Sequence, residues 1–421
     1  MLLTEAVAAT VASGRGVVVC VPDARDLARL DAALTARLGE GQHAVLAADL
    51  GPAKRYAAFL SVRRGAVRVA IGTRAAAFAP VHDLGLVAVW DDGDDLYDEP
   101  RAPYPHTRDV LLERARLTGC GVVLAAHARS VEAQYLVRTG WARELVAPRD
   151  ELRQRVRVAV TGDSDHDLQR DPFARQSRIP REVHEVITAG LATGPVLVQT
   201  PRAGYATRLA CDSCRTPSRC PECAGPLQIR SAHEPPVCDW CAHVATGWSC
   251  PECGGRGLRA PVLGDRRTAE ELGRAFPGTA VRTSAGDRIS ASVPSIPAIV
   301  VATPGAEPAV EGGYAAVILL DTWLFLARAD LRAAEEAVRR WSNAAAMVAR
   351  GGRVLLVGTP DHPALQALVR WDPAGFAERE IAERQSAHLP PASRVATVTG
   401  EPELVEGALE SIQQSGAMPP A

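Results

Sequence analysis

The sequence predicts an α/β protein of two parallel-sheet lobes, with a two-metal cysteine module inserted in the second lobe and a partial domain at the carboxyl end. Two observations support this fold class. Short apolar runs alternate with helical stretches along most of the 421 residues, which is typical of parallel sheets covered by helices on both faces. Most of the ten cysteines fall within residues 211–253, at spacings typical of metal sites.

The first lobe is expected over residues 1–147. Thr4–Ser13 has a helical composition, and the apolar run Val17–Val21, closed by Pro22, indicates a buried strand. The same alternation continues downstream. Further helices are expected at 26–38, 52–64, 107–117 and 129–138, and further strands at 43–47, 67–71, 84–90 and 121–126.

The second lobe is expected at 181–206 and 259–372, on either side of the cysteine module at 207–258. Residues 148–180 are rich in Arg, Asp, Pro and Gln around one short apolar stretch, Val156–Val160, and we interpret them as the linker between the lobes. Helices are expected at 181–191, 268–275 and 329–349, and strands at 196–199, 297–301, 315–320 and 353–358.

Residues 373–421 are interpreted as a partial C-terminal domain. A helix is expected at 374–388, where Pro390 and Pro391 end it. Arg394–Thr399 is predicted to be the first strand of that domain, which the chain leaves incomplete at Ala421.

Four CxxC pairs occupy the middle of the chain. Two intervening residues let both thiolates of a pair face one ion, and four sulfurs close a tetrahedral Zn²⁺ site. Eight sulfurs therefore predict two zinc ions per chain, both structural, because no coordination position remains for a catalytic water. Spacing alone leaves sequential and nested grouping of the pairs open. The pairs are Cys211/Cys214, Cys220/Cys223, Cys238/Cys241 and Cys250/Cys253.

A disulfide framework is the alternative for these cysteines, and it belongs to oxidising compartments. The amino end lacks the basic segment of a signal peptide, which disfavours that alternative. Cys20 and Cys120 adjoin apolar runs and are expected to be buried free thiols. No apolar run approaches the roughly 20 residues that cross a bilayer, so we expect a cytoplasmic protein without a membrane partner.

The charge of the chain does not indicate a generally basic nucleic-acid binder. Its formal net charge is −2 and its pI is about 6.6, so any DNA contact must be local. Trp240 and Trp248, within the cysteine block, could stack on an unpaired base or pack against the metal turns. Arginines concentrate at Arg63 and Arg64, Arg149–Arg157, Arg202, Arg215, Arg219 and Arg256–Arg267, although a single arginine is more often solvated surface.

Short motifs occur in a fixed order on both sides of the cysteine block. In the first lobe they are Gly72-Thr73-Arg74, Phe78-Ala79-Pro80, Leu84-Gly85-Leu86, and His106, Arg108 and Asp109. In the second they are Gly204-Tyr205-Ala206, Phe276-Pro277-Gly278, Asp330-Leu331-Arg332-Ala333 and Pro390-Pro391. Together with the cysteines, these motifs resemble the PriA family of bacterial primosomal replication-restart proteins, from about residue 15 to about residue 395.

The resemblance implies a superfamily 2 helicase fold with two RecA-like lobes, associated with the nucleoid. Its implied partners are forked or single-stranded DNA, primosome proteins and single-strand-binding protein. It also implies nested grouping of the cysteines. Cys211, Cys214, Cys250 and Cys253 would then hold one zinc ion, and Cys220, Cys223, Cys238 and Cys241 the other.

The nucleotide motifs depart from the family pattern. No GxxxxGK[ST] occurs, the single lysine, Lys54, lies in a different helix, and the family's amino-terminal DNA-binding domain has no counterpart. Where the family has Asp-Glu-Glu-His, this chain has Trp90-Asp91-Asp92-Gly93, so an indole replaces the magnesium aspartate. Asp91, Asp92, Asp94 and Asp95 are interpreted as a solvated turn, with a displaced metal site as the alternative.

Three further motifs are altered. The Ser-Ala-Thr motif reads Ala126-His127-Ala128, and His127 is interpreted as structural. The Thr-Gln-Met motif reads Thr303-Pro304-Gly305. Met347 stands at the first arginine-finger position, and Arg350 occupies the second. We therefore assign no catalytic or nucleotide-binding residue and expect neither ATP nor magnesium, while enzymatic activity stays an open question.

Three functions fit these observations. The favoured one is a restart factor that binds abandoned forks and promotes primosome assembly and reloading of the replicative helicase without helicase activity of its own. The second is an active ATP-dependent 3′–5′ DNA helicase. The third is a protein-interaction scaffold, or a fragment, that no longer binds DNA.

Overall fold

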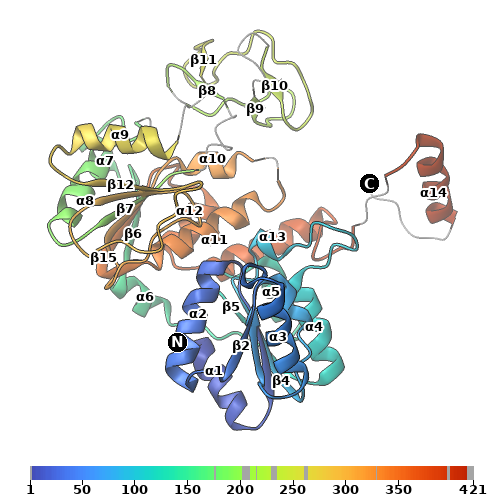
Figure 1. The fold of residues 1–421 in the computed structure, drawn as a ribbon. Coiled ribbons are helices and arrows are strands. Elements are labelled where there is room, and N and C mark those ends of the chain that lie inside the picture. The colour runs from blue at the N-terminus through green and yellow to red at the C-terminus, as the bar shows by residue number, and fades with distance from the viewer. Residues whose placement is uncertain are drawn as a thin grey trace.

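The computed structural model describes residues 2–174, 177–201, 209–214, 216–228, 235–259, 264–328, 330–395 and 399–414. Within them the chain forms two parallel sheets covered by helices and a small module of short strands (Figure 1). The module interrupts the second lobe between two of its strands. The predicted α/β class, with two parallel-sheet lobes and an inserted cysteine module, is confirmed.

Lobe 1 contains a parallel sheet of five strands, β1 (Gly16–Cys20), β2 (His43–Leu46), β3 (Val69–Gly72), β4 (Leu84–Trp90) and β5 (Gly121–Ala125). Their order is β2-β3-β1-β4-β5, so β1 lies at the centre and is buried along its whole length. The helices are α1 (Leu2–Ala12), α2 (Ala24–Leu38), α3 (Pro52–Arg63), α4 (Thr107–Thr118) and α5 (Val131–Arg138), with short turns η1 (Ala48–Leu50), η2 (Arg74–Phe78) and η3 (Asp95–Tyr97).

Local signals in the sequence account for several of these boundaries. The Asp23 carboxylate accepts two backbone N–H bonds and begins α2, and the Ser130 hydroxyl begins α5 by accepting one from Ala133. Gly119 ends α4 in the left-handed conformation that glycine adopts without strain. Gly72 is required where β2 and β3 approach, because a Cβ there would lie 2.3 Å from the Leu46 carbonyl oxygen.

Lobe 2 contains a parallel sheet of six strands, β6 (Arg157–Val160), β7 (Val196–Gln199), β12 (Val281–Ser284), β13 (Ile299–Ala302), β14 (Tyr314–Leu319) and β15 (Val348–Leu356). Their order is β12-β13-β7-β14-β15-β6. The helices are α6 (Arg149–Arg155), α7 (Asp165–Arg170), α8 (Arg181–Leu191), α9 (Asp265–Ala275), α10 (Thr322–Leu326), α11 (Ala333–Ala345) and α12 (Pro363–Val369).

Two boundaries of lobe 2 differ from the expected ones. The segment 148–180, predicted as a linker, contributes β6, the edge strand that pairs with β15. Charged and polar residues surround this short apolar stretch, and at the edge of the sheet it is only partly buried, so its sequence resembles that of a linker. The helix predicted at 329–349 is shorter, because the Tyr314 N–H donates to the Met347 carbonyl and β15 begins at Val348.

The cysteine module is built from two small antiparallel pairs rather than a large core. β8 (Ala210–Cys211) pairs with β11 (Leu258–Arg259), and β9 (Leu227–Gln228) pairs with β10 (Val237–Cys238). Beyond the sulfurs, its core consists mainly of Leu209, Leu227, Ala245 and Trp248. So small a core needs further stabilisation, which a metal would provide.

The helix α13 (Pro373–Ser386) packs against α5 of lobe 1 and α12 of lobe 2. It therefore belongs to the two-lobe body, which corrects its assignment to a separate C-terminal domain. α14 (Pro402–Gln414) stands away from that body (Figure 1). Residues 396–398, in the strand predicted at 394–399, lie outside the described residues. Among the described helices, none has both the length and the hydropathy that crossing a membrane requires.

Candidate metal centres and the cleft between the lobes

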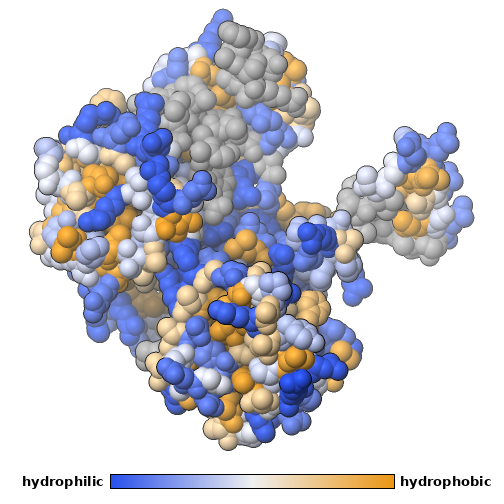
Figure 2. Space-filling view, in the orientation of Figure 1, coloured by the Kyte–Doolittle hydropathy of each residue, from blue (hydrophilic) through white to orange (hydrophobic). Residues whose placement is uncertain are grey.

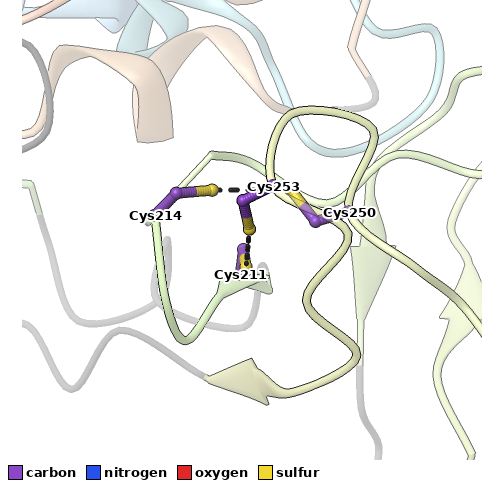
Figure 3. Close-up of side chains that lie close together, drawn as sticks. All are labelled: Cys211, Cys214, Cys250 and Cys253. Carbon is purple, nitrogen blue, oxygen red and sulfur yellow. Dashed lines mark hydrogen bonds between the residues drawn. The ribbon is translucent and has the colours of Figure 1, made fainter.

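The eight CxxC sulfurs form two groups of four, and the first is drawn in Figure 3. Within each group the four Sγ atoms lie within 4.8 Å of one another, with contacts between 3.3 and 3.7 Å. Tetrahedral zinc with bonds of about 2.3 Å would place its sulfurs about 3.8 Å apart. The donor set and its spacing therefore fit Zn²⁺, with one small adjustment of each sulfur.

The grouping of the sulfurs is nested. Cys211 Sγ lies 3.6 Å from Cys253 Sγ, and Cys214 Sγ lies 3.4 Å from Cys250 Sγ, so the outer two pairs converge. The inner group is Cys220, Cys223, Cys238 and Cys241. Spacing had left this choice open, because the strand pairing that brings residues 211 and 258 together is not visible in the cysteine pattern.

All four CxxC turns share one backbone hydrogen bond. In each, the N–H of the first cysteine donates to the carbonyl five residues later, at 2.7 to 2.9 Å. This bond closes the turn so that both thiolates face the same point. The donor and acceptor pairs are Cys211 and Thr216, Cys220 and Gly225, Cys238 and His243, and Cys250 and Gly255.

The residue before each acceptor has a left-handed backbone wherever the structure describes it. These residues are Ala224, Ala242 and Gly254, with φ of 57°, 59° and 71°, while residue 215 lies outside the described part. Only glycine adopts this conformation without strain. The Trp240 N–H also donates to Cys238 Sγ at 3.3 Å, as expected of turns that present amides to sulfur.

The two tryptophans of the module have different roles. Trp248 is 8% exposed, and its Nε1–H donates to the Arg219 carbonyl at 3.0 Å, so it packs against the module. Trp240 is 56% exposed. Its ring lies over Gly225, where a Cβ would come within 2.9 Å of it. Of the predicted cationic sites near the module, Arg202 and Arg215 lie outside the described residues.

The acidic loop after β4 is buried, not solvated. Asp91, Asp92 and Asp94 are 3%, 2% and 4% exposed, because α11 of lobe 2 covers the carboxyl end of β4. The interpretation as a solvated turn is therefore wrong for these three acids, while Asp95 is exposed. A buried carboxylate requires a charge partner or a hydrogen-bond donor, and each of these three has one.

Arg339 of α11 supplies the partner for two of these acids. Its Nη1–H group donates to Asp91 Oδ2 at 2.7 Å and to Asp94 Oδ2 at 2.8 Å. Asn343, one turn further along α11, also donates to Asp91 Oδ2 at 2.7 Å. Burial raises the pKa of Asp91 despite these contacts. At Asp94 burial acts in the same direction, but Arg339 and Arg340 outweigh it and lower the pKa.

A second set of contacts joins the lobes beside the first. Arg108 of lobe 1 contacts Asp92 at 3.3 Å and Glu132 at 3.4 Å, and Glu132 also pairs with Arg332 of lobe 2. Burial opposes the charge on Glu132, but Arg108 and Arg332 outweigh it and lower its pKa to about 2. The Val131 N–H donates to Glu335 Oε1 of α11 at 3.0 Å.

A pocket of about 220 Å³ lies beside these ion pairs. Carboxylates outnumber guanidinium groups on its walls by six to three. A triphosphate requires an excess of cations, so this wall composition disfavours a nucleotide. The carboxylates are Asp94, Asp95, Asp98, Asp330, Glu335 and Glu336, and the guanidinium groups are Arg328, Arg332 and Arg340.

Known proteins resemble the chain over nearly its whole length. It is 50% identical over 413 residues to the "Probable replication restart protein PriA" of Mycobacterium tuberculosis, covering 97% of this chain and 63% of that protein. The chain is thus similar to proteins of the PriA family over nearly its whole length. The protein of the same name from Mycobacterium leprae is 48% identical over 421 residues, covering 99% of this chain and 64% of that protein.

Other similarities are weaker. The "Replication restart protein PriA" of Bacillus subtilis is 24% identical over 417 residues, covering 94% of this chain and 51% of that protein. This PriA homologue thus spans just under two thirds of the mycobacterial proteins. No family model matches the chain. A structure of RecG bound to a three-way DNA junction aligns with a TM-score of 0.42 and 11% identity, covering 95% of this chain and 44% of RecG.

The altered helicase motifs of this PriA homologue have structural roles. Trp90, at the magnesium-aspartate position, stacks edge-on against His127 with ring centroids 5.1 Å apart. Burial lowers the pKa of His127 and so favours the neutral form of its ring. Arg350 is exposed near the amino end of β15, and Met347 is half-buried. Arg25 of lobe 1 donates to the Gly305 carbonyl, so the Thr303-Pro304-Gly305 loop also contacts lobe 1.

Sequence reasoning missed the residues that join the lobes. Arg339, Arg340 and Asn343 lie on one face of α11, because residues three or four apart on a helix are neighbours. A run of two arginines and an asparagine at that spacing, upstream of the arginine-finger segment, was the available signal. The sequence does not show that these side chains face the acidic loop, because that contact depends on how the two lobes pack together.

Proposed function

We propose that this PriA homologue acts in replication restart as a DNA-binding factor that works without hydrolysing ATP. In this proposal it binds abandoned forks and promotes primosome assembly and reloading of the replicative helicase, with primosome proteins and single-strand-binding protein as partners. Its place would be on the nucleoid. The relatives at 48–50% identity are named as probable replication restart proteins, which supports the process.

One observation carries the part of the proposal that concerns ATP. Asp91 and Asp94, in the acidic loop, are committed to Arg339 across the cleft, at 2.7 and 2.8 Å. A carboxylate that already accepts a buried guanidinium is a poor magnesium ligand, because the cation would have to displace that arginine. The predominantly acidic pocket beside it supports the same conclusion.

We also propose that both cysteine groups hold Zn²⁺. Four thiolates per site leave no open position for water, so each ion would hold the turns of the module in place rather than perform chemistry. The module would then present the exposed Trp240 as a stacking surface for an unpaired base.

The test is fork-DNA binding by the full zinc-loaded chain over a salt series, with and without Mg-ATP. We expect an affinity that falls steeply with salt and is the same in both nucleotide conditions. Loss of fork binding after zinc chelation would further support a role of the module.

Two other outcomes would overturn parts of the proposal. A change in affinity with Mg-ATP, or phosphate release stimulated by DNA, would show a working nucleotide site and favour the helicase. No measurable DNA binding at any salt concentration would leave the chain as an interaction scaffold.

A further inference from the structure

The outer face of α3 carries exposed side chains that the contacts between the lobes do not use. Of its twelve residues only Val62 is buried. Tyr56 is 64% exposed and Phe59 is 36% exposed, although most large apolar side chains of this lobe lie in its two cores. Figure 2 shows hydrophobic residues interleaved with hydrophilic ones on the front of lobe 1, where α3 lies in Figure 1.

The segment around α3 is cationic without any compensating acid. Between Asp49 and Asp83 the sequence has no Asp or Glu. Its cations are Lys54, Arg55, Arg63, Arg64, Arg68 and Arg74.

Of these six cationic residues, all except Arg74 are exposed. Arg74 pairs with Glu99 at 3.1 Å. The other five form no ion pair with a carboxylate in the described part of the chain. The local charge is therefore strongly positive on a protein whose net charge is −2.

The aromatic and cationic residues share one side of the helix. Residues three and four apart on a helix are neighbours, so Arg55, Phe59 and Arg63 form a row, and Tyr56 adjoins Phe59. At 1.5 Å per residue, that row extends over about 12 Å. Two rings thus stand between two guanidinium groups.

We propose that this face of α3 binds single-stranded DNA, with Tyr56 and Phe59 stacking on bases and Arg55 and Arg63 contacting phosphates. The inference rests on the proposed DNA-binding function and assigns it a surface. An unpaired strand presents both π faces and a phosphate at every nucleotide, whereas the bases of a duplex are already stacked. A single helix face is convex, so it lacks the groove that an apolar peptide side chain requires.

The test uses the full zinc-loaded chain and a fluorescein-labelled twenty-nucleotide oligo(dT), with binding followed by anisotropy across a salt series. Tyr56→Ala/Phe59→Ala should lower the affinity at least tenfold at fixed salt and leave the salt slope unchanged, since stacking contributes about 1–3 kcal/mol per base. Arg55→Ala/Arg63→Ala should reduce the slope by about 1.4, because each phosphate contact to a single strand contributes about 0.7.

Arg274→Ala/Arg282→Ala is the matched control, since both arginines are exposed on lobe 2 and lie far from α3 in the sequence. This control removes the same charge and should change neither the affinity at fixed salt nor the salt slope. Zinc content and thermal unfolding confirm that each variant is folded. Tyr56→Leu, which keeps an apolar side chain without the ring, replaces the double variant if that variant fails to fold.

The outcomes separate this inference from the proposed function. If the wild-type chain binds neither fork nor oligo(dT), the proposed function itself is wrong. If the wild-type chain binds both and the α3 variants bind equally well, only the α3 site is wrong. A labelled peptide of residues 399–414, which is acidic and apolar, tests the remaining alternative. If the variants lose that peptide but keep oligo(dT), the surface is a peptide site and the inference is overturned.

Discussion

Asp91, directly after β4, and Arg339, in the middle of α11, are joined by a hydrogen-bonded ion pair of 2.7 Å, although they lie 248 positions apart in the sequence. Both side chains are 4% exposed. The pair lies between the two sheets, at the loop where the family pattern places its magnesium acids. In this chain an ion pair between two protein side chains therefore joins the lobes at that loop.

Removal of Arg339 should be strongly destabilising. Arg339→Met keeps most of the side-chain volume but leaves Asp91 and Asp94 buried without their cation. Breaking a buried pair from one side costs about 3–5 kcal/mol, because the remaining charge has lost both water and partner. Urea denaturation at pH 7 measures the unfolding free energy. Arg350→Met is the control, since Arg350 is exposed, and it should shift that free energy by less than about 0.5 kcal/mol.

Part of this arrangement could be predicted from the sequence. The ranges 84–90, 181–191 and 196–199 agree with β4, α8 and β7, because long apolar runs and helical periodicity are local properties. The ion pairs between the lobes are not local. The four aspartates after β4 resemble an exposed turn until α11 is seen to cover three of them.

The same limit applies to the cysteines. CxxC spacing predicted which residues would bind metal, but the nested grouping of their sulfurs depends on the pairing of β8 with β11 across the module. Spacing also gave no sign that Trp248 would be buried and Trp240 exposed, since both lie within a few residues of a cysteine.

Acid should weaken the contact between the lobes through Glu132. Its pKa in the folded chain is about 2, below the ordinary value of 4.5. A depressed carboxylate pKa contributes stability that is fully present above the unfolded value and is lost as pH falls from about 4.5 toward 2. The shift corresponds to about 3 kcal/mol.

The measurement is the unfolding free energy of the wild-type chain and of Glu132→Gln at several pH values between 6 and 2.5. Protonation of the cysteine thiols affects both proteins alike, so only their difference is interpreted. We expect that difference to shrink as the pH falls. A difference independent of pH would mean that the pairs with Arg108 and Arg332 do not hold the Glu132 charge.

Nested metal sites can be distinguished from sequential ones by counting zinc. Cys211→Ser/Cys250→Ser removes two ligands of one nested site and leaves the other intact, so it should retain one zinc per chain. Sequential sites would each lose a ligand in that variant, and both ions would be lost. Zinc released by denaturation is measured with a chromogenic chelator. Cys120→Ala, a buried cysteine outside the module, should retain two.

The left-handed residues of the CxxC turns allow a matched pair of substitutions. Ala242 has φ of 59°, a conformation that costs a residue with a Cβ about 1–2 kcal/mol and glycine almost nothing. Ala242→Gly should therefore stabilise the module, partly offset by the entropy of a more flexible unfolded chain. Gly254→Ala is the converse change, at φ of 71° with no atom within 4 Å of the added methyl group, so only backbone strain is introduced.

The readout is the rate at which a chelator removes zinc, because release requires the turn to open. We expect Ala242→Gly to slow release from the site of Cys238 and Cys241, and Gly254→Ala to accelerate release from the site of Cys250 and Cys253, each about fivefold to tenfold for a change near 1 kcal/mol. Opposite changes in the release rate at these two equivalent positions would show that the backbone conformation of the turn causes the effect. If both substitutions accelerated release, Ala242 would have to act through a side-chain contact, and the shared geometry of the turns would not explain their stability.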